Sequence, residues 1–252
     1  MFSNSYIFKY SAVMVILVAA LLAGAAILLQ PAQDRNIKVE KIQDMLASAK
    51  INSTPENAEK LYDEHILKEI VLDEQGEELS VYSDGKFEKG KLRAFDIDLK
   101  AQLKIKLDAE AGKTTEEPVY PLFICQKGKD TLYIIPMRGN GLWGPVWGNM
   151  AFKSDLSTVE GVTFGHKGET PGLGAEISTP IFEEQFPGKK ILDEKGEFTS
   201  IKVIKGGVKN SNIDPVHGVD AISGGTITSM GVNAMIANNL TNYVTYIKNH
   251  RK

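Results

Sequence analysis

An uncharged apolar segment near the N-terminus constrains the fold more than any other feature of the chain. Residues 11–29 read SAVMVILVAALLAGAAILL, in which Ser11 is the single polar side chain. At about 1.5 Å per residue, an α-helix of this length measures roughly 28 Å, close to the hydrocarbon thickness of a bilayer. Tyr6, Phe8 and Tyr10 precede it, where interfacial aromatic residues are common. The sequence therefore predicts a transmembrane helix over residues 11–30.

A cleaved signal peptide is the alternative interpretation of this segment. Its apolar region would span only about 7–15 residues and would end at a cleavage site of small residues. Here Gln30, Pro31 and Ala32 follow, which is a poor cleavage site. We therefore expect an uncleaved single-pass anchor, with residues 31–252 forming a soluble domain.

The flanking charges bear on which side that domain faces. Lys9 and the amino terminus precede the apolar segment, whereas Arg35, Lys38 and Lys41 follow it closely. Counted by the positive-inside rule, these charges favour a cytoplasmic soluble domain by a small margin.

The composition excludes several classes of protein. The chain has 252 residues, 42% of them hydrophobic, which is typical of globular proteins, and its net charge of −3 gives no basic surplus for nucleic acid. Cys125 is the single cysteine, so an internal disulfide and a cysteine-ligated zinc or iron–sulfur site are excluded.

Hydrophobic spacing predicts an α+β domain after the anchor, because helices and strands do not alternate regularly. Helices are expected over 37–46, over 58–70 after a start at 54–57, and over 231–247. Strands are expected at 122–125 and 132–135 as a hairpin, and at 159–165 and 199–204. Residues 71–115 are charged and poorly periodic, which predicts short strands and loops.

Three segments are rich in glycine and small hydroxyl residues. We call them the tryptophan segment (138–148), which contains both tryptophans, the glutamate segment (166–176) and the hydroxyl segment (217–229). The glutamate segment has neither the spacing of a dinucleotide fingerprint nor the Gly-Lys-Ser/Thr of a phosphate-binding loop. His166 and Glu169 could together bind a metal, but a histidine near a glutamate in a loop is more often simply hydrogen-bonded. No metal is therefore predicted.

Two of the segments leave alternatives open. The tryptophan segment is either a structural turn with buried tryptophans or one wall of a site for a flat aromatic ligand. The hydroxyl segment stands where the last helix should begin, so Ser223, Thr226 and Thr228 are either cap residues or part of a phosphate site. Lys205, beside two glycines, is either a solvated strand end or a phosphate partner.

The sequence Asp220-Ala221-Ile222-Ser223-Gly224-Gly225-Thr226 resembles the flavinylation motif of the covalent FMN-binding domain family, and Glu169-Thr170-Pro171-Gly172-Leu173-Gly174 matches a second family motif. The motifs run from about 139 to 231, and the FMN-binding part is expected at about 120–252. With the anchor and the length, the chain resembles the C subunits of Na+-translocating NADH:quinone reductases. Gly225 departs from the family, which usually has alanine there.

The resemblance implies a role for each matching residue. Thr226 would be the acceptor, joined to FMN by a phosphoester that a dedicated flavin transferase forms, and Thr228 is the rival hydroxyl. Ser223, Gly224 and Gly225 would shape the turn that exposes Thr226. Thr170, Leu173 and Trp143 would approach the flavin ring, and Lys205 would pair with the phosphate. No acid–base pair or nucleophile for turnover is expected.

The resemblance also implies a function and a location. The chain would be an electron-transfer subunit of a Na+-exporting complex in the cell inner membrane, together with other subunits that pass electrons from NADH to ubiquinone. Residues 1–10 would be cytoplasmic and the flavin domain periplasmic, against the charge count. A G-type subunit of an Rnf ferredoxin:NAD+ oxidoreductase and a non-redox membrane-anchored binding module are the alternatives.

Overall fold

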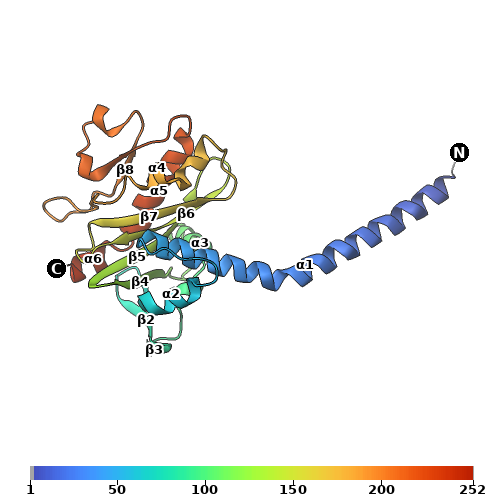
Figure 1. The fold of residues 1–252 in the computed structure, drawn as a ribbon, viewed down its shortest axis with the longest axis horizontal. Helices are drawn as coiled ribbons and strands as arrows, with labels where there is room; N and C mark the ends of the chain where they lie inside the picture. Colours follow the sequence, from blue (N-terminus) through green and yellow to red (C-terminus); the bar gives the residue numbers. More distant parts are fainter. Residues whose placement is uncertain (1–2, 252) are drawn as a thin grey trace. The chain divides into compact units, whose positions relative to one another are not determined.

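The computed structural model describes residues 3–251. The chain divides into two units, Met1–Lys41 and Ile42–Lys252. The first unit consists of the N-terminal part of α1, a helix that spans Asn4–Ser48 and contains Pro31 (blue in Figure 1). Its most apolar window has a mean hydropathy of 2.9 and no buried residue, so its length and composition suit a membrane span.

The second unit is built on an antiparallel sheet of seven strands in the order β3-β2-β1-β4-β5-β6-β7 (Figure 1). A separate parallel pair joins β8 to β9. The strands are β1 (Ile66–Leu72), β2 (Glu78–Ser83), β3 (Lys86–Lys89), β4 (Tyr120–Lys127), β5 (Asp130–Asn140), β6 (Pro145–Phe152), β7 (Val159–His166), β8 (Lys202–Ile204) and β9 (Gly218–Asp220).

Short helices connect and cover the strands. The α-helices are α2 (Ala58–His65), α3 (Leu99–Glu110), α4 (Pro180–Glu183), α5 (Thr226–Thr241) and α6 (Val244–His250). The 3-10 turns are η1 (Ala94–Asp96), η2 (Gly174–Ser178), η3 (Val208–Asn210) and η4 (Pro215–His217). The expected α+β class is confirmed.

The sheet is buried on both faces. In β5, Ile135 and Met137 belong to one apolar cluster with α5, whereas the alternate buried residue Ile134 points to the opposite face. The last turns of α1 cover that opposite face, where the Thr163 hydroxyl of β7 donates a 3.0 Å hydrogen bond to the Asp44 carbonyl. The sheet therefore holds α5 in a fixed place against the centre of the second unit.

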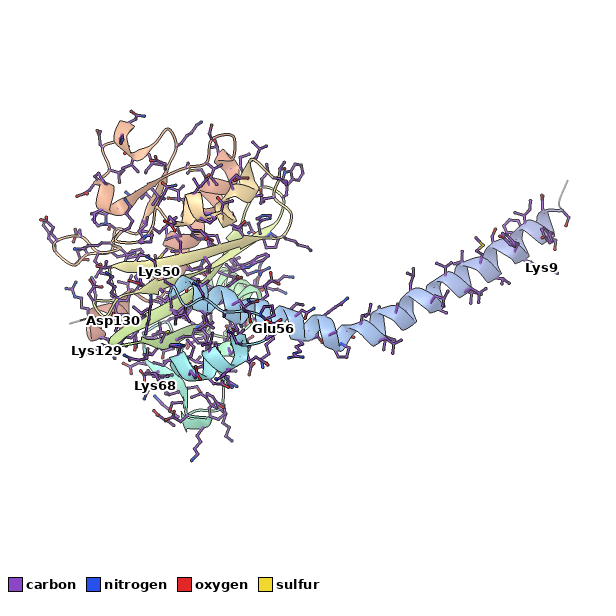
Figure 2. All side chains as sticks on the ribbon, in the orientation of Figure 1. Lys9, Lys50, Glu56, Lys68, Lys129 and Asp130 are labelled. Carbon is purple, nitrogen blue, oxygen red and sulfur yellow. The ribbon has the colours of Figure 1, made fainter. Side chains whose placement is uncertain are left out.

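Several expected elements are confirmed. The predicted hairpin is β4 and β5, which turn at Gly128 with a φ of +61°, a conformation that favours glycine. Figure 2 labels the neighbouring Lys129 and Asp130 at this turn. Strand β7 matches the prediction over 159–165, and the helix over 37–46 is the continuation of α1.

Other expectations were wrong in part. The helix expected over 58–70 ends at His65, because Ile66 and Ile70 lie in β1, paired with β4. The region 71–115, expected as strands and loops, also contains α3. The strand expected over 199–204 forms only over Lys202–Ile204. The closing helix begins at Thr226 rather than 231 and breaks between α5 and α6.

Candidate functional site

The first residue of α5 is Thr226, with Gly225 in the position before the helix. The backbone N–H groups of Thr226, Ile227 and Thr228 donate to no acceptor among the described residues, as expected for a first helical turn. Ser229 is buried, and its hydroxyl accepts a 3.1 Å hydrogen bond from the Ile222 N–H, which closes the preceding turn. The helix therefore begins with three unengaged amides at its positive end.

Thr226 and Thr228 differ sharply in their surroundings. Thr228 is only 1% exposed, and its hydroxyl donates a 2.5 Å hydrogen bond to Glu169 Oε2. Thr226 is half-buried, and no hydrogen bond engages its hydroxyl within residues 3–251. Of the two threonines, only Thr226 presents a free hydroxyl.

Glu169 connects the three glycine-rich segments. Besides the bond from Thr228 in the hydroxyl segment, Glu169 Oε1 accepts a 2.8 Å hydrogen bond from the Trp143 N–H in the tryptophan segment. The Glu169 N–H donates within its own segment to His166 Nδ1 at 3.2 Å. The sequence marked Glu169 as the first residue of a family motif and as a possible partner of His166, but it did not predict the hydrogen bonds to the other two segments.

The glycines of the site leave room for these contacts. A Cβ at Gly174 would lie 2.5 Å from both Glu169 Oε2 and Thr228 Oγ1. Gly224 has a φ of +76°, and a Cβ there would lie 2.6 Å from Leu173 Cδ2. A Cβ at Gly225, where the family usually has alanine, would lie 3.0 Å from the Leu173 carbonyl oxygen. The turn before α5 is thus in close contact with the glutamate segment.

Replacing Gly174 with alanine is expected to destabilise the fold by about 1–3 kcal/mol, because the new methyl group must separate Glu169 from Thr228. Gly168→Ala is the matched control, since a Cβ at Gly168 would meet nothing within 4 Å. Chemical denaturation of both variants measures the difference. Equal stability of the two would contradict the packing argument.

Several of the predicted ring contacts are exposed side chains. Trp143 is 67% exposed and Leu173 is 42% exposed, and Thr170 is also exposed. The alternative of a buried Trp143 is wrong. The exposure of these three side chains leaves them accessible to a ligand.

Lys205 lies one residue after a strand that pairs with the start of the turn preceding α5. It follows β8 directly, where Ile204 pairs with Asp220 and the Ala221 N–H donates to the Ile204 carbonyl at 3.0 Å. Its side chain is exposed. No ion pair joins Lys205 to another residue in the described part of the chain.

Glu183, at the end of α4, lies against β7. Its carboxylate accepts a 2.7 Å hydrogen bond from the Phe164 N–H of β7. The pKa of Glu183 is raised to about 7, mainly because the carboxyl group is buried; the Phe164 hydrogen bond lowers it and the nearby Asp44 carboxylate raises it. Protonation of Glu183 therefore favours the folded state.

Because the pKa of Glu183 is higher in the folded than in the unfolded chain, the fold binds an extra proton between about pH 4.5 and pH 7. The free energy of unfolding should therefore fall as pH rises through this window. In the Glu183→Gln variant, the free energy of unfolding should decrease less between low and high pH than in the wild type. We expect the difference to be up to about 2 kcal/mol, allowing for solvent screening of a partly exposed group. Urea denaturation of the wild type and the variant at pH 5 and pH 8 measures this difference. An equal change with pH in the two proteins would contradict the prediction.

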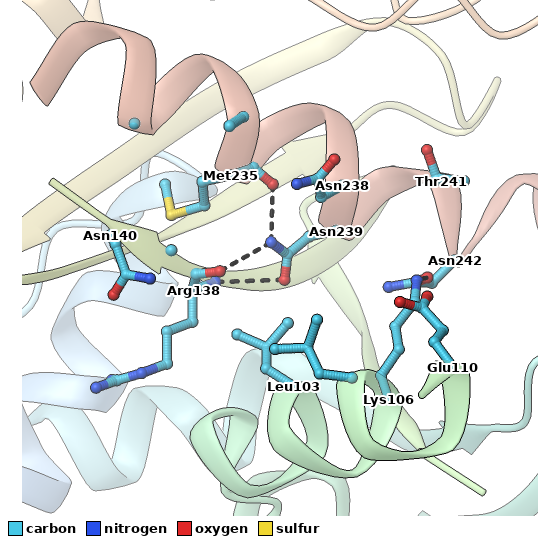
Figure 3. Close-up of a pocket in the computed structure, with 14 residues that line it drawn as sticks. Leu103, Lys106, Glu110, Arg138, Asn140, Met235, Asn238, Asn239, Thr241 and Asn242 are labelled. Atoms are coloured by element: carbon cyan, nitrogen blue, oxygen red, sulfur yellow. Dashed lines mark hydrogen bonds between the residues drawn. The ribbon is translucent and has the colours of Figure 1, made fainter. Parts of the chain in front are cut away.

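A cavity of about 510 Å³ lies between α3, the end of β5 and α5 (Figure 3). Asn239 closes one side, since its amide donates to the Arg138 carbonyl at 2.9 Å and to the Met235 carbonyl at 2.8 Å. Gly139 and Asn140 of the tryptophan segment line it, but none of the eight predicted cofactor-binding residues does. The cavity is therefore separate from the exposed start of α5.

Comparisons with known proteins match this architecture. Residues 141–241 match the FMN-binding domain family, which covers all of the tryptophan segment after Asn140 and the other two segments. A match of this domain supports FMN as the cofactor.

Curated relatives cover most of the chain. The C subunit of the Na(+)-translocating NADH-quinone reductase of Pseudomonas aeruginosa is 33% identical over 220 residues, covering 85% of this chain and 82% of that protein. The corresponding C subunit of Haemophilus ducreyi is 33% identical over 215 residues, covering 84% of this chain and 80% of that protein.

Solved structures agree with the fold. The crystal structure of the Na(+)-translocating NADH-quinone reductase C subunit from Parabacteroides distasonis has a TM-score of 0.72 and 37% identity, covering 87% of this chain and 96% of that one. NqrC of Shewanella oneidensis, at 24% identity and a TM-score of 0.62, covers 86% and 99% and shares the fold. These names favour a C subunit over the G-type subunit of an Rnf complex. The chain belongs to the family of Na+-translocating NADH-quinone reductase C subunits.

Proposed function

We propose that this chain carries FMN on Thr226 through a phosphoester bond and relays electrons within a Na+-translocating NADH:quinone reductase, an oxidoreductase complex whose other subunits are its partners. The relatives are named as subunits of that complex. The observation on which the attachment rests is the contrast between the free Thr226 hydroxyl and the buried, bonded Thr228 hydroxyl.

The residues at the start of α5 fit a phosphate. Three unengaged amides and the positive end of a 16-residue helix favour an anion beside the Thr226 hydroxyl. Ser223 is exposed in the same turn. Gly224 has a φ of +76°, a backbone conformation that favours glycine and that this turn requires. Lys205, exposed after β8 and next to the residue that pairs with Asp220, would pair with the phosphate.

The side chains around the turn fit a flat ring. Trp143, Thr170 and Leu173 present their exposed side chains on loops that contact Glu169 or the turn before α5. Together they would form an open wall rather than a closed cavity, which leaves a ring edge accessible to a partner subunit. When bound, FMN supplies the electron transfer itself, and this chain orients it.

Attachment needs a flavin transferase and an activated flavin nucleotide. In the transfer, a bond forms between Thr226 Oγ1 and the FMN phosphorus while the phosphoanhydride bond of the donor breaks. The nucleoside monophosphate leaves, and the hydroxyl proton goes to a base of the transferase or to water. No oxidation or reduction is involved.

The chain would lie in the cell inner membrane as a single-pass protein, with the flavin domain on the periplasmic side. The apolar part of α1 has the length and hydropathy for the span. This placement follows the family resemblance. The flanking charges, Lys9 before the span and Arg35, Lys38 and Lys41 after it, favour the cytoplasmic side by a small margin.

Mass spectrometry of the chain purified from its native membrane tests the proposal. We expect a mass increase of one FMN less one water, located on the peptide that contains Thr226, and a fluorescent band after denaturing electrophoresis. A chain co-expressed with its transferase that shows no flavin band would defeat the redox function and favour a non-redox binding module.

A further inference from the structure

We propose that Glu169 is the positioning residue that selects the attachment site: it withdraws the Thr228 hydroxyl and leaves Thr226 as the acceptor. The same carboxylate fixes the tryptophan segment relative to α5. This inference rests on the proposed function, because it concerns where and how FMN is attached.

The Glu169 carboxylate links two segments by hydrogen bonds. Its two oxygens accept from different segments, Oε1 from the Trp143 N–H at 2.8 Å and Oε2 from the Thr228 hydroxyl at 2.5 Å. No lysine or arginine forms an ion pair with it in residues 3–251. Both of its donors are neutral, so the carboxylate acts through geometry rather than through a charge pair.

Burial makes this arrangement unusual. Glu169 is only 5% exposed, and a buried carboxylate costs free energy unless its oxygens are hydrogen-bonded. The chain also keeps glycine at 141 and 174, where a Cβ would collide with this carboxylate. An apolar side chain at this position would leave the Trp143 N–H and the Thr228 hydroxyl without their acceptor, so the carboxylate is matched to the position of these two donors.

The bond to Thr228 settles which hydroxyl is available. A threonine hydroxyl has one proton, and that of Thr228 is donated to Glu169 in a buried site. Thr226 lies two residues earlier, about 200° around the helix, and therefore faces away from Glu169. A transferase that approaches from solvent meets Thr226 and not Thr228.

The bond to Trp143 links the same choice to the ring wall. Because one carboxylate holds both the Trp143 backbone and the first turn of α5, the exposed indole and the acceptor keep a fixed separation. Loss of Glu169 should therefore change both the attachment and the surroundings of the attached ring.

The test compares four variants of the full chain co-expressed with a flavin transferase. Glu169→Gln keeps the size but turns one acceptor oxygen into a donor. Thr228→Val removes the bonded hydroxyl, and Thr228→Ser keeps it. Glu176→Gln is the matched control, since Glu176 lies in the same segment but its carboxylate accepts from the nearby Gly172 N–H, at 2.9 Å, rather than from another segment.

Peptide mass spectrometry measures the rate and the site of FMN attachment, and visible circular dichroism of the loaded fraction reports the asymmetry around the ring. We expect Glu169→Gln to slow attachment at Thr226 at least fivefold, to place detectable FMN on Thr228, and to weaken the dichroism. Thr228→Val should slow attachment at least threefold, whereas Thr228→Ser and Glu176→Gln should match wild type.

Thermal melting of each variant separates loss of folding from loss of positioning. If Glu169→Gln does not fold, Thr228→Val, which retains Glu169, decides the outcome. Attachment at the wild-type rate on Thr226 alone in both variants would overturn the inference, as would an equal loss in Glu176→Gln. Wild-type chains that take no FMN would overturn the proposed function as well, so the two failures are distinguishable.

Discussion

Thr226→Ala is expected to abolish covalent flavin, lowering the FMN content of the purified chain from near one per chain to below detection. The reason is chemical, because the phosphoester requires the Thr226 oxygen, and the nearest rival hydroxyl, on Thr228, is bonded to Glu169. Intact mass and in-gel fluorescence measure the loss directly. Since the Thr226 side chain is half-buried and its hydroxyl is unbonded, folding should change little.

Two further substitutions serve as controls for this result. Thr226→Ser keeps a hydroxyl in register and should retain flavin, and Thr228→Ala should retain flavin on Thr226, although more slowly. Location of FMN on Thr228 in the wild-type chain would contradict the assignment. Flavin retained by Thr226→Ala would do the same.

Placing two acidic residues in the middle of the apolar segment is expected to release the chain from the membrane. On an insertion scale, aspartate at the centre of a span costs about 2.5–3.5 kcal/mol, so Val18→Asp with Leu22→Asp costs roughly 5–7 kcal/mol. That corresponds to a shift of about 10⁴ in the insertion equilibrium. Fractionation with a carbonate wash measures it, and Val18→Leu with Leu22→Val is the matched control.

A reporter fused after Lys252 extends this test to the side of the membrane. With an intact anchor, an export-dependent reporter should be active, and the double aspartate variant should lose that activity. Activity of a reporter that works only in the cytoplasm would contradict the periplasmic placement. An acidic variant that stays in the membrane fraction would show that the anchor lies elsewhere.

The elements that sequence predicted correctly are those specified by local signals. The β4–β5 hairpin has a glycine turn between two apolar runs, and α1 has an unbroken apolar segment. Helix α3 was missed because none of its residues is buried, so the sequence has no strong apolar face there. Two local signals were present: Asp98 caps the helix, and Leu99, Leu103 and Leu107 recur every four residues.

Strand β1 shows the opposite failure. Ile66 and Ile70 are four residues apart, which fits a helix, but both are β-branched and pair with β4, which follows about fifty residues later. Local spacing cannot express that pairing, because it depends on a partner strand distant in sequence. The same limit affects helix ends, as at Thr226, where the first turn of α5 lies against the glutamate segment, which is distant in sequence.

The candidate site was predicted in its parts but not in its connections. The motifs identified the three glycine-rich segments and left Thr226 and Thr228 as competing hydroxyls. The motif register favoured Thr226 as the acceptor, but no local signal indicated the hydrogen bond that engages Thr228, because Thr228 and Glu169 lie 59 positions apart. Glu169 carried a weak signal, as the one acidic residue flanked by the glycines at 168, 172 and 174.

The separation of Trp143, Glu169 and Thr228 along the chain has a consequence for maturation. Their hydrogen bonds span 26 and 59 residues, so they can form only after the strands between them have assembled. An unfolded or half-folded chain has no such arrangement and exposes both threonines alike. If the transferase modifies only the folded chain, covalent flavin distinguishes correctly folded chains from misfolded ones before they join a larger complex.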